Sequence, residues 1–139
     1  MKLGHVHIKV RDIKRAETFY TKLLGFKVTE RFEDQYVFLA FDKAHHDLAL
    51  KNVGVDAPIP SHNSTGLYHF AFEVANENEL KALYQKLKQN GIVLTPVDHG
   101  ISKAFYFSDP DGNGIEVYVD TRHKRTAWGG KELVLDLEN

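Results

Sequence analysis

Polar and apolar residues alternate over residues 3–10 and again over residues 67–74, and the two stretches resemble each other. Alternation with a period of two predicts a β-strand. After each of these strands, apolar residues recur at spacings of three and four, which predicts an amphipathic helix. Three more strand-like stretches follow each helix. The pattern therefore predicts a β-α-β-β-β unit that occurs twice in the chain.

Signals for helix ends support both predicted helices. Asp12 stands where it can cap the first helix, and Asn76 with Glu79 resembles a capping box before the second. Gly25 and Gly91 stand where the helices are expected to stop. The apolar stripes of the two helices contain Ile13, Ala16, Phe19, Tyr20, Leu23 and Leu24, and Leu80, Leu83, Tyr84 and Leu87. The other predicted strands cover residues 26–32, 36–41, 46–52, 92–97, 104–107 and 115–119, with a turn at 33–35.

The duplication predicts one domain over residues 1–139, of the α+β class. Unit one covers about residues 1–53 and unit two about residues 66–120. Between them, about residues 54–65 form a linker that holds two of the four prolines. Residues 121–139 form a C-terminal tail in which 132–136 are either a short strand or an arm. If the units pack with pseudo-twofold symmetry, their first and last strands line a common cleft.

Composition limits the classes of partner and of metal ligand. Hydrophobic residues make up 42% of the chain and charged residues 27%, which is typical of a globular protein. The net charge of −1 gives no electrostatic reason to expect nucleic acid or an anionic membrane. No stretch approaches the ~20 apolar residues of a membrane span, and no signal peptide is recognised, so we expect a cytoplasmic protein. Without cysteine, any metal must be held by imidazole and carboxylate groups.

Aligning the two units brings candidate metal ligands into register. His5 coincides with His69, and Glu116 coincides with Ala49. Two imidazoles and one carboxylate leave about three positions of an octahedral ion open, as in non-haem Fe(II) oxygenases. A single strand histidine is more often a hydrogen-bonded or exposed residue, and Glu116 alone fits a solvated strand face. His7 shares a strand face with His5, so spacing alone leaves it as a rival ligand, although the alignment favours His5.

These residues resemble the vicinal oxygen chelate superfamily, which includes glyoxalase I, fosfomycin and bleomycin resistance proteins and extradiol dioxygenases. The resemblance extends from His5 to about Trp128 and is most similar to the catechol 2,3-dioxygenase, or type I extradiol, branch. The resemblance rests first on the candidate ligands that the repeat alignment brings into register, His5, His69 and Glu116. It rests also on the sequence His-His-Asp-Leu-Ala-Leu at residues 45–50, on His-Gly-Ile at 99–101, and on Tyr106, ten residues before Glu116. It implies tandem βαβββ units that form one open, curved mixed β-sheet cleft.

The same resemblance implies roles for individual residues. His5, His69 and Glu116 would bind Fe(II), with Mn(II), Ni(II) and Zn(II) as alternative ions. His46 would be the catalytic acid–base histidine beside the O₂ position, and His99 and Tyr106 would be catalytic residues on the substrate side. His7 is a further substrate-binding candidate. Each catalytic candidate also has a structural alternative: His46 as a surface histidine, His99 as a histidine that caps a loop, and Tyr106 as a core tyrosine.

The resemblance implies ring cleavage of a catechol-like vicinal diol by a metal-dependent extradiol dioxygenase. Its partners would be a small aromatic diol and O₂, and the usual form of the architecture is a homodimer. Two other classes of function stay open. One is another metal enzyme of the superfamily, such as a glyoxalase-like isomerase or a thiol transferase. The other is a non-catalytic protein that binds a small molecule or antibiotic among its aromatic residues, which make up 12% of the chain.

Overall fold

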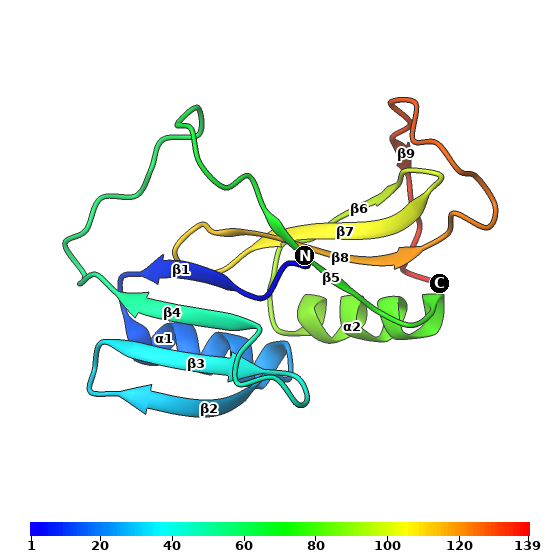
Figure 1. Cartoon of the computed structure of the whole chain (residues 1–139). Coiled ribbons are helices and arrows are strands. Elements are labelled where there is room, and N and C mark those ends of the chain that lie inside the picture. The colour runs from blue at the N-terminus through cyan, green and yellow to red at the C-terminus, as the bar shows by residue number, and fades with distance from the viewer. The chain divides into compact units, whose positions relative to one another are not determined.

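The computed structural model describes all 139 residues and divides into two compact units (Figure 1). Unit 1 consists of residues 1–66 together with the short segment 109–113. Unit 2 consists of residues 67–108 and 114–139. A loop of the second sequence repeat therefore belongs, by its contacts, to the unit that the first repeat builds.

Unit 1 is a four-stranded mixed sheet with a helical segment on one face (Figure 1). In chain order its elements are β1 (Val6–Val10), α1 (Ile13–Thr18), the π-helical η1 (Phe19–Leu23), β2 (Lys27–Phe32), β3 (Tyr36–Ala40) and β4 (Leu48–Asn52). The strand order is β1-β4-β3-β2, in which β1 and β4 are parallel and the other neighbours are antiparallel.

Unit 2 repeats this arrangement and adds one strand from the tail. Its elements are β5 (Phe70–Glu73), α2 (Glu77–Gln89), β6 (Thr95–Asp98), β7 (Ser102–Ser108), β8 (Gly114–Asp120) and β9 (Leu133–Val134). The order is β5-β8-β7-β6-β9, with β5 and β8 parallel. Helix α2 covers one face of this sheet (Figure 1). The ring centroids of Tyr84 on α2 and Phe105 on β7 are 5.6 Å apart.

Pairing registers show that the two sheets are equivalent residue by residue. In unit 1, His7 on β1 pairs with Ala49 on β4. In unit 2, Ala71 on β5 pairs with Glu116 on β8. The position that carries Glu116 in one sheet therefore carries Ala49 in the other. The α+β class with tandem βαβββ units is confirmed, and the strands form two open mixed sheets.

The helix signals in the sequence act as expected. The Asp12 side chain accepts hydrogen bonds from the backbone N–H groups of residues 14 and 15. Asn76 accepts from the N–H of Glu79, and the Glu79 carboxylate accepts from the N–H of residue 75. Gly25 and Gly91 follow the helices with φ of 80° and 77°, a left-handed conformation that a side chain would strain. Both helical segments, the first made of α1 and η1 and the second of α2, therefore begin and end near the residues that predict their ends.

The first helix differs from prediction in its second half. The sequence predicts a regular helix through residue 24, but the turn from Phe19 to Leu23 is π-helical. The Thr21 hydroxyl donates to the carbonyl of Glu17 at 2.8 Å, which is the carbonyl that a regular helix would pair with the Thr21 N–H. A π-helical turn is wider than an α-helical one, and here it contains the fully buried Tyr20.

Several strand boundaries also differ from prediction, and three of them concern candidate histidines. His5 and His69 each lie one residue before the first ladder residue of β1 and β5, outside the strands in which they were expected. His46 likewise precedes β4 by two residues. The three histidines therefore stand at strand entrances, where a side chain has fewer neighbours than inside a sheet.

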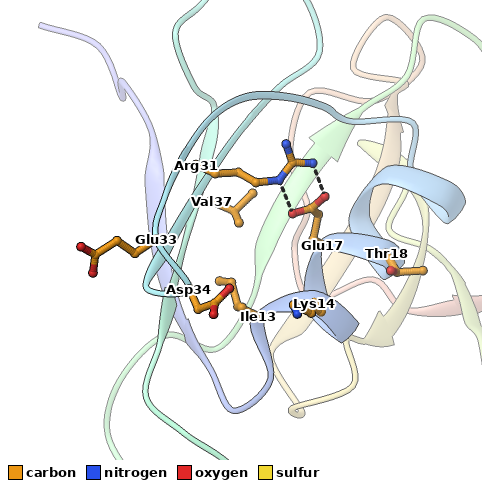
Figure 2. Close-up of a pocket in the computed structure, with 8 residues that line it drawn as sticks. All are labelled: Ile13, Lys14, Glu17, Thr18, Arg31, Glu33, Asp34 and Val37. Atoms are coloured by element: carbon orange, nitrogen blue, oxygen red, sulfur yellow. Dashed lines mark hydrogen bonds and ion pairs between the residues drawn. The ribbon is translucent and has the colours of Figure 1, made fainter.

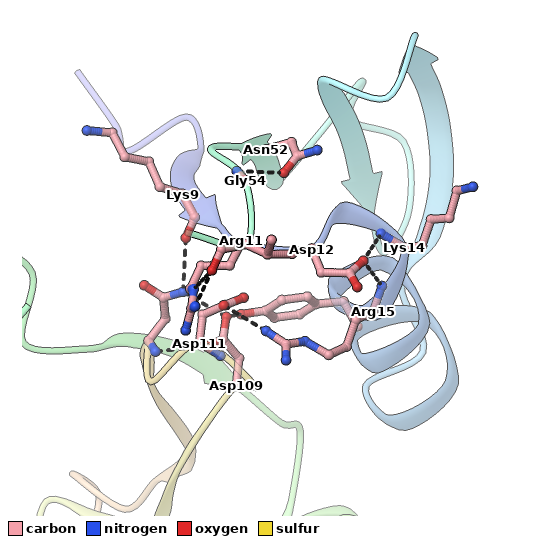
Figure 3. Close-up of polar contacts among 12 residues, drawn as sticks. Lys9, Arg11, Asp12, Lys14, Arg15, Asn52, Gly54, Asp109 and Asp111 are labelled. Carbon is pink, nitrogen blue, oxygen red and sulfur yellow. Dashed lines mark hydrogen bonds and ion pairs between the residues drawn. The ribbon is translucent and has the colours of Figure 1, made fainter. Parts of the chain in front are cut away.

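The segment 109–113 is held in unit 1 by buried polar contacts (Figure 3). The Tyr20 hydroxyl donates to Asp109 Oδ2 at 2.7 Å, and both groups are buried. Asp109 Oδ1 accepts from the backbone N–H groups of Asp111 and Asn113, both at 2.9 Å. Arg15 contacts Asp111 Oδ1 at 2.8 Å. Burial raises the pKa of Tyr20 and Asp109 raises it further, so the phenol remains a donor at every working pH.

We predict that Tyr20→Phe destabilises the protein by about 1.5–3 kcal/mol, because a buried hydrogen bond to a charged group is lost. Urea unfolding followed by circular dichroism measures this change. Tyr118→Phe is the matched control, since the Tyr118 hydroxyl contacts Glu73 at 3.3 Å in an exposed setting. Equal destabilisation by the two variants would contradict a special role for the Tyr20–Asp109 bond.

Candidate metal and acid–base site

Unit 2 brings two of the three predicted metal ligands together. Nε2 of His69 lies 3.1 Å from Oε2 of Glu116. The side chain of Glu116 is 12% exposed and that of His69 is 30% exposed, so both are largely withdrawn from water. Glu116 points away from its buried neighbours Ile115 and Val117 because successive strand residues face opposite sides of a sheet.

This pair suits a divalent cation. Two ligand atoms at about 2.1 Å from an ion and at right angles to each other are about 3.0 Å apart. The observed separation of 3.1 Å between His69 and Glu116 matches that spacing. Nδ1 of His69, on the far side of the ring from Glu116, is buried without a hydrogen-bond partner, so the chain does not supply the bond that usually orients a ligating imidazole. A nitrogen and a carboxylate oxygen form a donor set that Fe(II), Mn(II), Ni(II) and Zn(II) all accept.

Beside this pair, Tyr106 and His99 form a second polar couple. Tyr106 is the strand neighbour of Glu116 in the β7–β8 ladder, so the two side chains share one face of the sheet. The Tyr106 hydroxyl is 2.8 Å from Nε2 of His99, and the ring of Tyr106 is 5.4 Å from that of His69. Four of the predicted site residues are therefore neighbours within unit 2.

The surroundings of Tyr106 keep its phenol protonated. Burial raises the pKa of Tyr106, and the adjacent Glu116 carboxylate raises it further. Nδ1 of His99 is 3.2 Å from the carbonyl oxygen of Lys131, which can only accept a hydrogen bond. In the neutral form of His99, Nδ1 therefore carries the proton and Nε2 is an acceptor for the Tyr106 hydroxyl. The Glu116 carboxylate is a second acceptor for the single hydrogen of that hydroxyl.

Unit 1 gathers the other predicted histidines. The ring of His5 is 4.3 Å from that of His46, and the ring of His7 is 5.9 Å from that of Tyr36. Burial lowers the pKa of His46, and His5 and His45 add to the effect, so His46 is neutral near pH 7. His5 immediately precedes β1 as His69 precedes β5, whereas His7 occupies the register position of Ala71.

A carboxylate–histidine–histidine chain in unit 1 was missed by sequence reasoning. Nε2 of His45 is 2.8 Å from a Glu30 carboxylate oxygen, and its Nδ1 is 2.8 Å from Nδ1 of His46. In the neutral form of His45, the Glu30 carboxylate, which can only accept, places the proton on Nε2, so Nδ1 accepts from His46. In that arrangement neutral His46 has an unprotonated Nε2. The pair His45-His46 was a visible signal, but Glu30 lies 15 residues away on another strand.

The predicted residues are thus divided between the units. His5, His7 and His46 belong to unit 1, and the four others belong to unit 2. Neither unit gathers three or more histidine, aspartate or glutamate side chains into a complete metal cage. The three-ligand set of His5, His69 and Glu116 stays a prediction.

Each unit also contains a pocket. In unit 2, a pocket of about 350 Å³ includes Glu116 and extends along β8 past Tyr118 to Asp120 and Arg122. In unit 1, a pocket of about 240 Å³ lies between α1 and the β2–β3 hairpin (Figure 2). None of the predicted site residues lines the pocket in unit 1. Its wall is closed by two hydrogen bonds between Arg31 and Glu17, so we assign it no role in the chemistry (Figure 2).

Comparison with known proteins identifies the family. The model of the glyoxalase/bleomycin resistance protein/dioxygenase superfamily matches residues 2–117. The chain belongs to this superfamily. No helix of the chain has the length and apolar character that crossing a membrane requires.

Two curated relatives in the superfamily are enzymes with different activities. Catechol-2,3-dioxygenase of Bacillus subtilis is 35% identical over 126 residues, which are 91% of this chain but only 43% of that enzyme. Lactoylglutathione lyase of Escherichia coli O157:H7 is 32% identical over 129 residues, which are 84% of this chain and 91% of that enzyme. The chain therefore spans less than half the length of the dioxygenase that it matches.

A solved member of the superfamily has the same fold. The crystal structure of a glyoxylase/bleomycin resistance protein/dioxygenase domain from Frankia sp. EAN1pec superposes with a TM-score of 0.75 at 22% identity. The match covers 86% of this chain and 98% of that one. At this identity, the likeness concerns the fold alone.

We predict that His69→Ala lowers the affinity for Fe(II) or Mn(II) by at least about tenfold, because an imidazole donor is removed beside Glu116. Equilibrium dialysis under anaerobic conditions, followed by elemental analysis, measures the bound metal. His123→Ala is the control, since His123 is an exposed histidine of the tail. If His69→Ala retains as much metal as the control, His69 is not a ligand.

Proposed function

We propose that the chain is a metal-dependent, extradiol-type ring-cleavage dioxygenase that acts on a catechol-like vicinal diol, with Fe(II) as its ion. The observation that carries the proposal is the adjacency in unit 2 of a metal-binding pair, His69 and Glu116, and a phenol–imidazole couple, Tyr106 and His99. A catechol needs both, since its two oxygens require a cation and a route for a proton. The likeness to the Bacillus subtilis catechol-2,3-dioxygenase supports the same substrate class.

His69, Glu116 and His5 are the proposed ligands of one ion. When bound, such an ion lowers the pKa of a coordinated hydroxyl, as it does for coordinated water, and it leaves positions open for a diol and O₂. Ala49 occupies in unit 1 the register position that Glu116 occupies in unit 2. Because alanine cannot bind a metal, this position adds no fourth protein ligand. A homodimer stays an expectation from the family resemblance.

Tyr106 and His99 provide a path for the proton of the substrate diol. Tyr106 donates its hydroxyl hydrogen to Nε2 of His99, so the lone pairs of its oxygen remain free to accept from a substrate hydroxyl. A proton that leaves the diol can pass to Tyr106 while the phenol proton passes to His99. The pKa of Tyr106, raised by burial, disfavours a lasting phenolate and suits this relay.

His46 is the proposed acid–base residue of unit 1. The Glu30–His45 pair fixes its Nδ1 as a donor, which leaves Nε2 unprotonated and able to accept a proton and return it later. The lowered pKa of His46 keeps the ring neutral before the reaction. An imidazole that gains and loses one proton near neutral pH suits this task.

The proposal predicts oxygen-dependent formation of a yellow product. The protein is loaded with Fe(II) under anaerobic conditions and then given catechol and air. Equal molar uptake of O₂ and catechol, with growth of visible absorbance, is the expected result. An Fe(II)-free sample and the His69→Ala variant are the controls. Saturable binding of catechol by the Fe(II)-loaded protein without O₂ uptake would contradict the proposal and indicate a binding protein.

We further predict that His46→Gln lowers kcat by about 10²–10⁴-fold, the usual contribution of a general acid–base residue. Bound metal and catechol affinity should stay close to those of the natural chain, because the substitution leaves His69, Glu116 and Tyr106 in place. Single-turnover kinetics and metal analysis test both statements. A loss of metal in parallel with activity would instead make His46 a ligand.

A glyoxalase-like isomerase is the second candidate function. The Escherichia coli lactoylglutathione lyase favours it, because the match covers 91% of that enzyme. Ala49 argues against it, since an isomerase that shuttles a carbon-bound proton benefits from a second carboxylate at the position equivalent to Glu116. Turnover of lactoylglutathione by the metal-loaded protein, with no O₂ uptake on catechol, would decide for this candidate.

A further inference from the structure

We propose that Trp128 is a positioning residue for His99, and that it acts through the backbone carbonyl of Lys131. The inference deepens the proposed function, on which it rests for the role of His99. Trp128 and Lys131 lie in the C-terminal tail, where the sequence predicted no catalytic or binding residue. All of its contacts lie within unit 2.

The carbonyl of Lys131 is held by two hydrogen bonds from aromatic rings. Nε1 of Trp128 donates to it at 2.7 Å, and Nδ1 of His99 lies 3.2 Å away. The indole N–H is a donor only, so its role in this pair is fixed. The rings of Trp128 and His99 meet edge to face, with centroids 6.1 Å apart. Trp128 therefore contacts both the carbonyl and the imidazole that the carbonyl orients.

The turn that carries the carbonyl is itself well fixed. The N–H of Lys131 donates to the carbonyl of Trp128 at 3.1 Å, which closes the turn from 128 to 131. The Arg125 guanidinium donates to the carbonyl of Ala127 at 2.7 Å. A Cβ at Gly100 would lie 2.8 Å from the flexible side chain of Arg125, so this part of the tail packs close to the residue after His99.

Both ends of the tail are attached to the sheet. At the start, Thr121 donates through its N–H to Ile101 and through its hydroxyl to Gly100, at 2.8 and 2.9 Å. Beyond the turn, β9 pairs with β6, and Leu137 is buried. The exposed segment between these attachments is held by the contacts of Arg125, Trp128 and Lys131 described above.

The consequence is a fixed direction for the His99–Tyr106 hydrogen bond. In water, a free neutral histidine side chain favours the tautomer with the proton on Nε2. That tautomer would turn the lone pair of Nδ1 toward the Lys131 carbonyl, which is also an acceptor. The carbonyl therefore selects the Nδ1–H form, and Nε2 becomes the acceptor that Tyr106 needs. Without Trp128, the carbonyl loses one of the two donors that orient it.

The tautomer can be read directly by NMR. Protein labelled with ¹⁵N-histidine gives two-bond ¹H–¹⁵N correlations for its eight imidazoles, and His99→Gln assigns the His99 signal. We expect His99 of the natural chain to be predominantly Nδ1–H. In Trp128→Phe, which keeps an aromatic ring but loses the N–H, the ratio of the Nδ1–H to the Nε2–H form should fall about fivefold, the effect of one hydrogen bond.

Val134→Ala is the matched control, because Val134 is an exposed tail residue whose backbone pairing with β6 is kept. It should leave the tautomer ratio unchanged. An Nδ1–H form that is not predominant in the natural chain, or a ratio that Trp128→Phe does not change, would overturn the inference. Because neither measurement needs metal or turnover, the inference can fail while the proposed function holds, and the reverse.

Turnover provides a second readout through a double-mutant cycle. Trp128→Phe should lower kcat/KM on catechol about fivefold in the natural background. In a His99→Gln background it should have no further effect, since an amide side chain has no tautomers to select. Equal losses in both backgrounds would show that Trp128 acts through general packing and would contradict the positioning role.

Discussion

A neutral imidazole has one nitrogen that donates and one that accepts, so the group that occupies one nitrogen decides what the other can do. In this chain the constraint acts on both histidines to which we assign proton transfer. Glu30 acts through His45 to leave Nε2 of His46 unprotonated. The Lys131 carbonyl acts on Nδ1 of His99 with the same result. In each unit, the proposed proton acceptor thus depends on a partner that can only accept a hydrogen bond.

His69 differs from these two histidines in its contacts. Its Nδ1 is buried without a hydrogen-bond partner, while its Nε2 lies against the carboxylate of Glu116. A ligating imidazole is usually oriented by a hydrogen bond from its other ring nitrogen, and the chain supplies none to Nδ1 of His69. The proposed ligand role of His69 therefore rests on the position of its Nε2 beside Glu116, at a separation that suits adjacent ligands of one ion.

Local signals made much of the fold predictable from the sequence. Asp12, Gly25 and Gly91 act at short range, so their patterns specify helix ends before any tertiary contact is known. The repeat alignment also predicted that Glu116 and Ala49 are equivalent, and the pairing registers agree. The pattern of polar and apolar side chains is enough to predict this strand register, because a shift by one residue would turn every apolar side chain of the strand toward water.

The parts that could not be predicted depend on backbone groups and on contacts between distant residues. The carbonyl of Lys131 has no sequence signature, since every residue has one. Glu30 reaches His45 only because the β2–β3 hairpin brings them together. The π-helical turn at Tyr20 depends on how one threonine hydroxyl competes for a carbonyl. Each of these features depends on geometry that exists only after folding.

The two repeats place different residues at equivalent positions of the same fold. By register, His46 before β4 is equivalent to Asn113 before β8. Asn113 donates through its side chain to Asp109 at 2.8 Å, so its loop closes on itself and packs beside Tyr20. His46 instead contacts the ring of His5. The repeat whose loop closes on itself keeps Glu116, and the repeat whose loop carries His46 has Ala49 in its place. Under the proposed function, this difference would make Glu116 of unit 2 the one carboxylate ligand, while the equivalent loop of unit 1 would supply the acid–base residue His46.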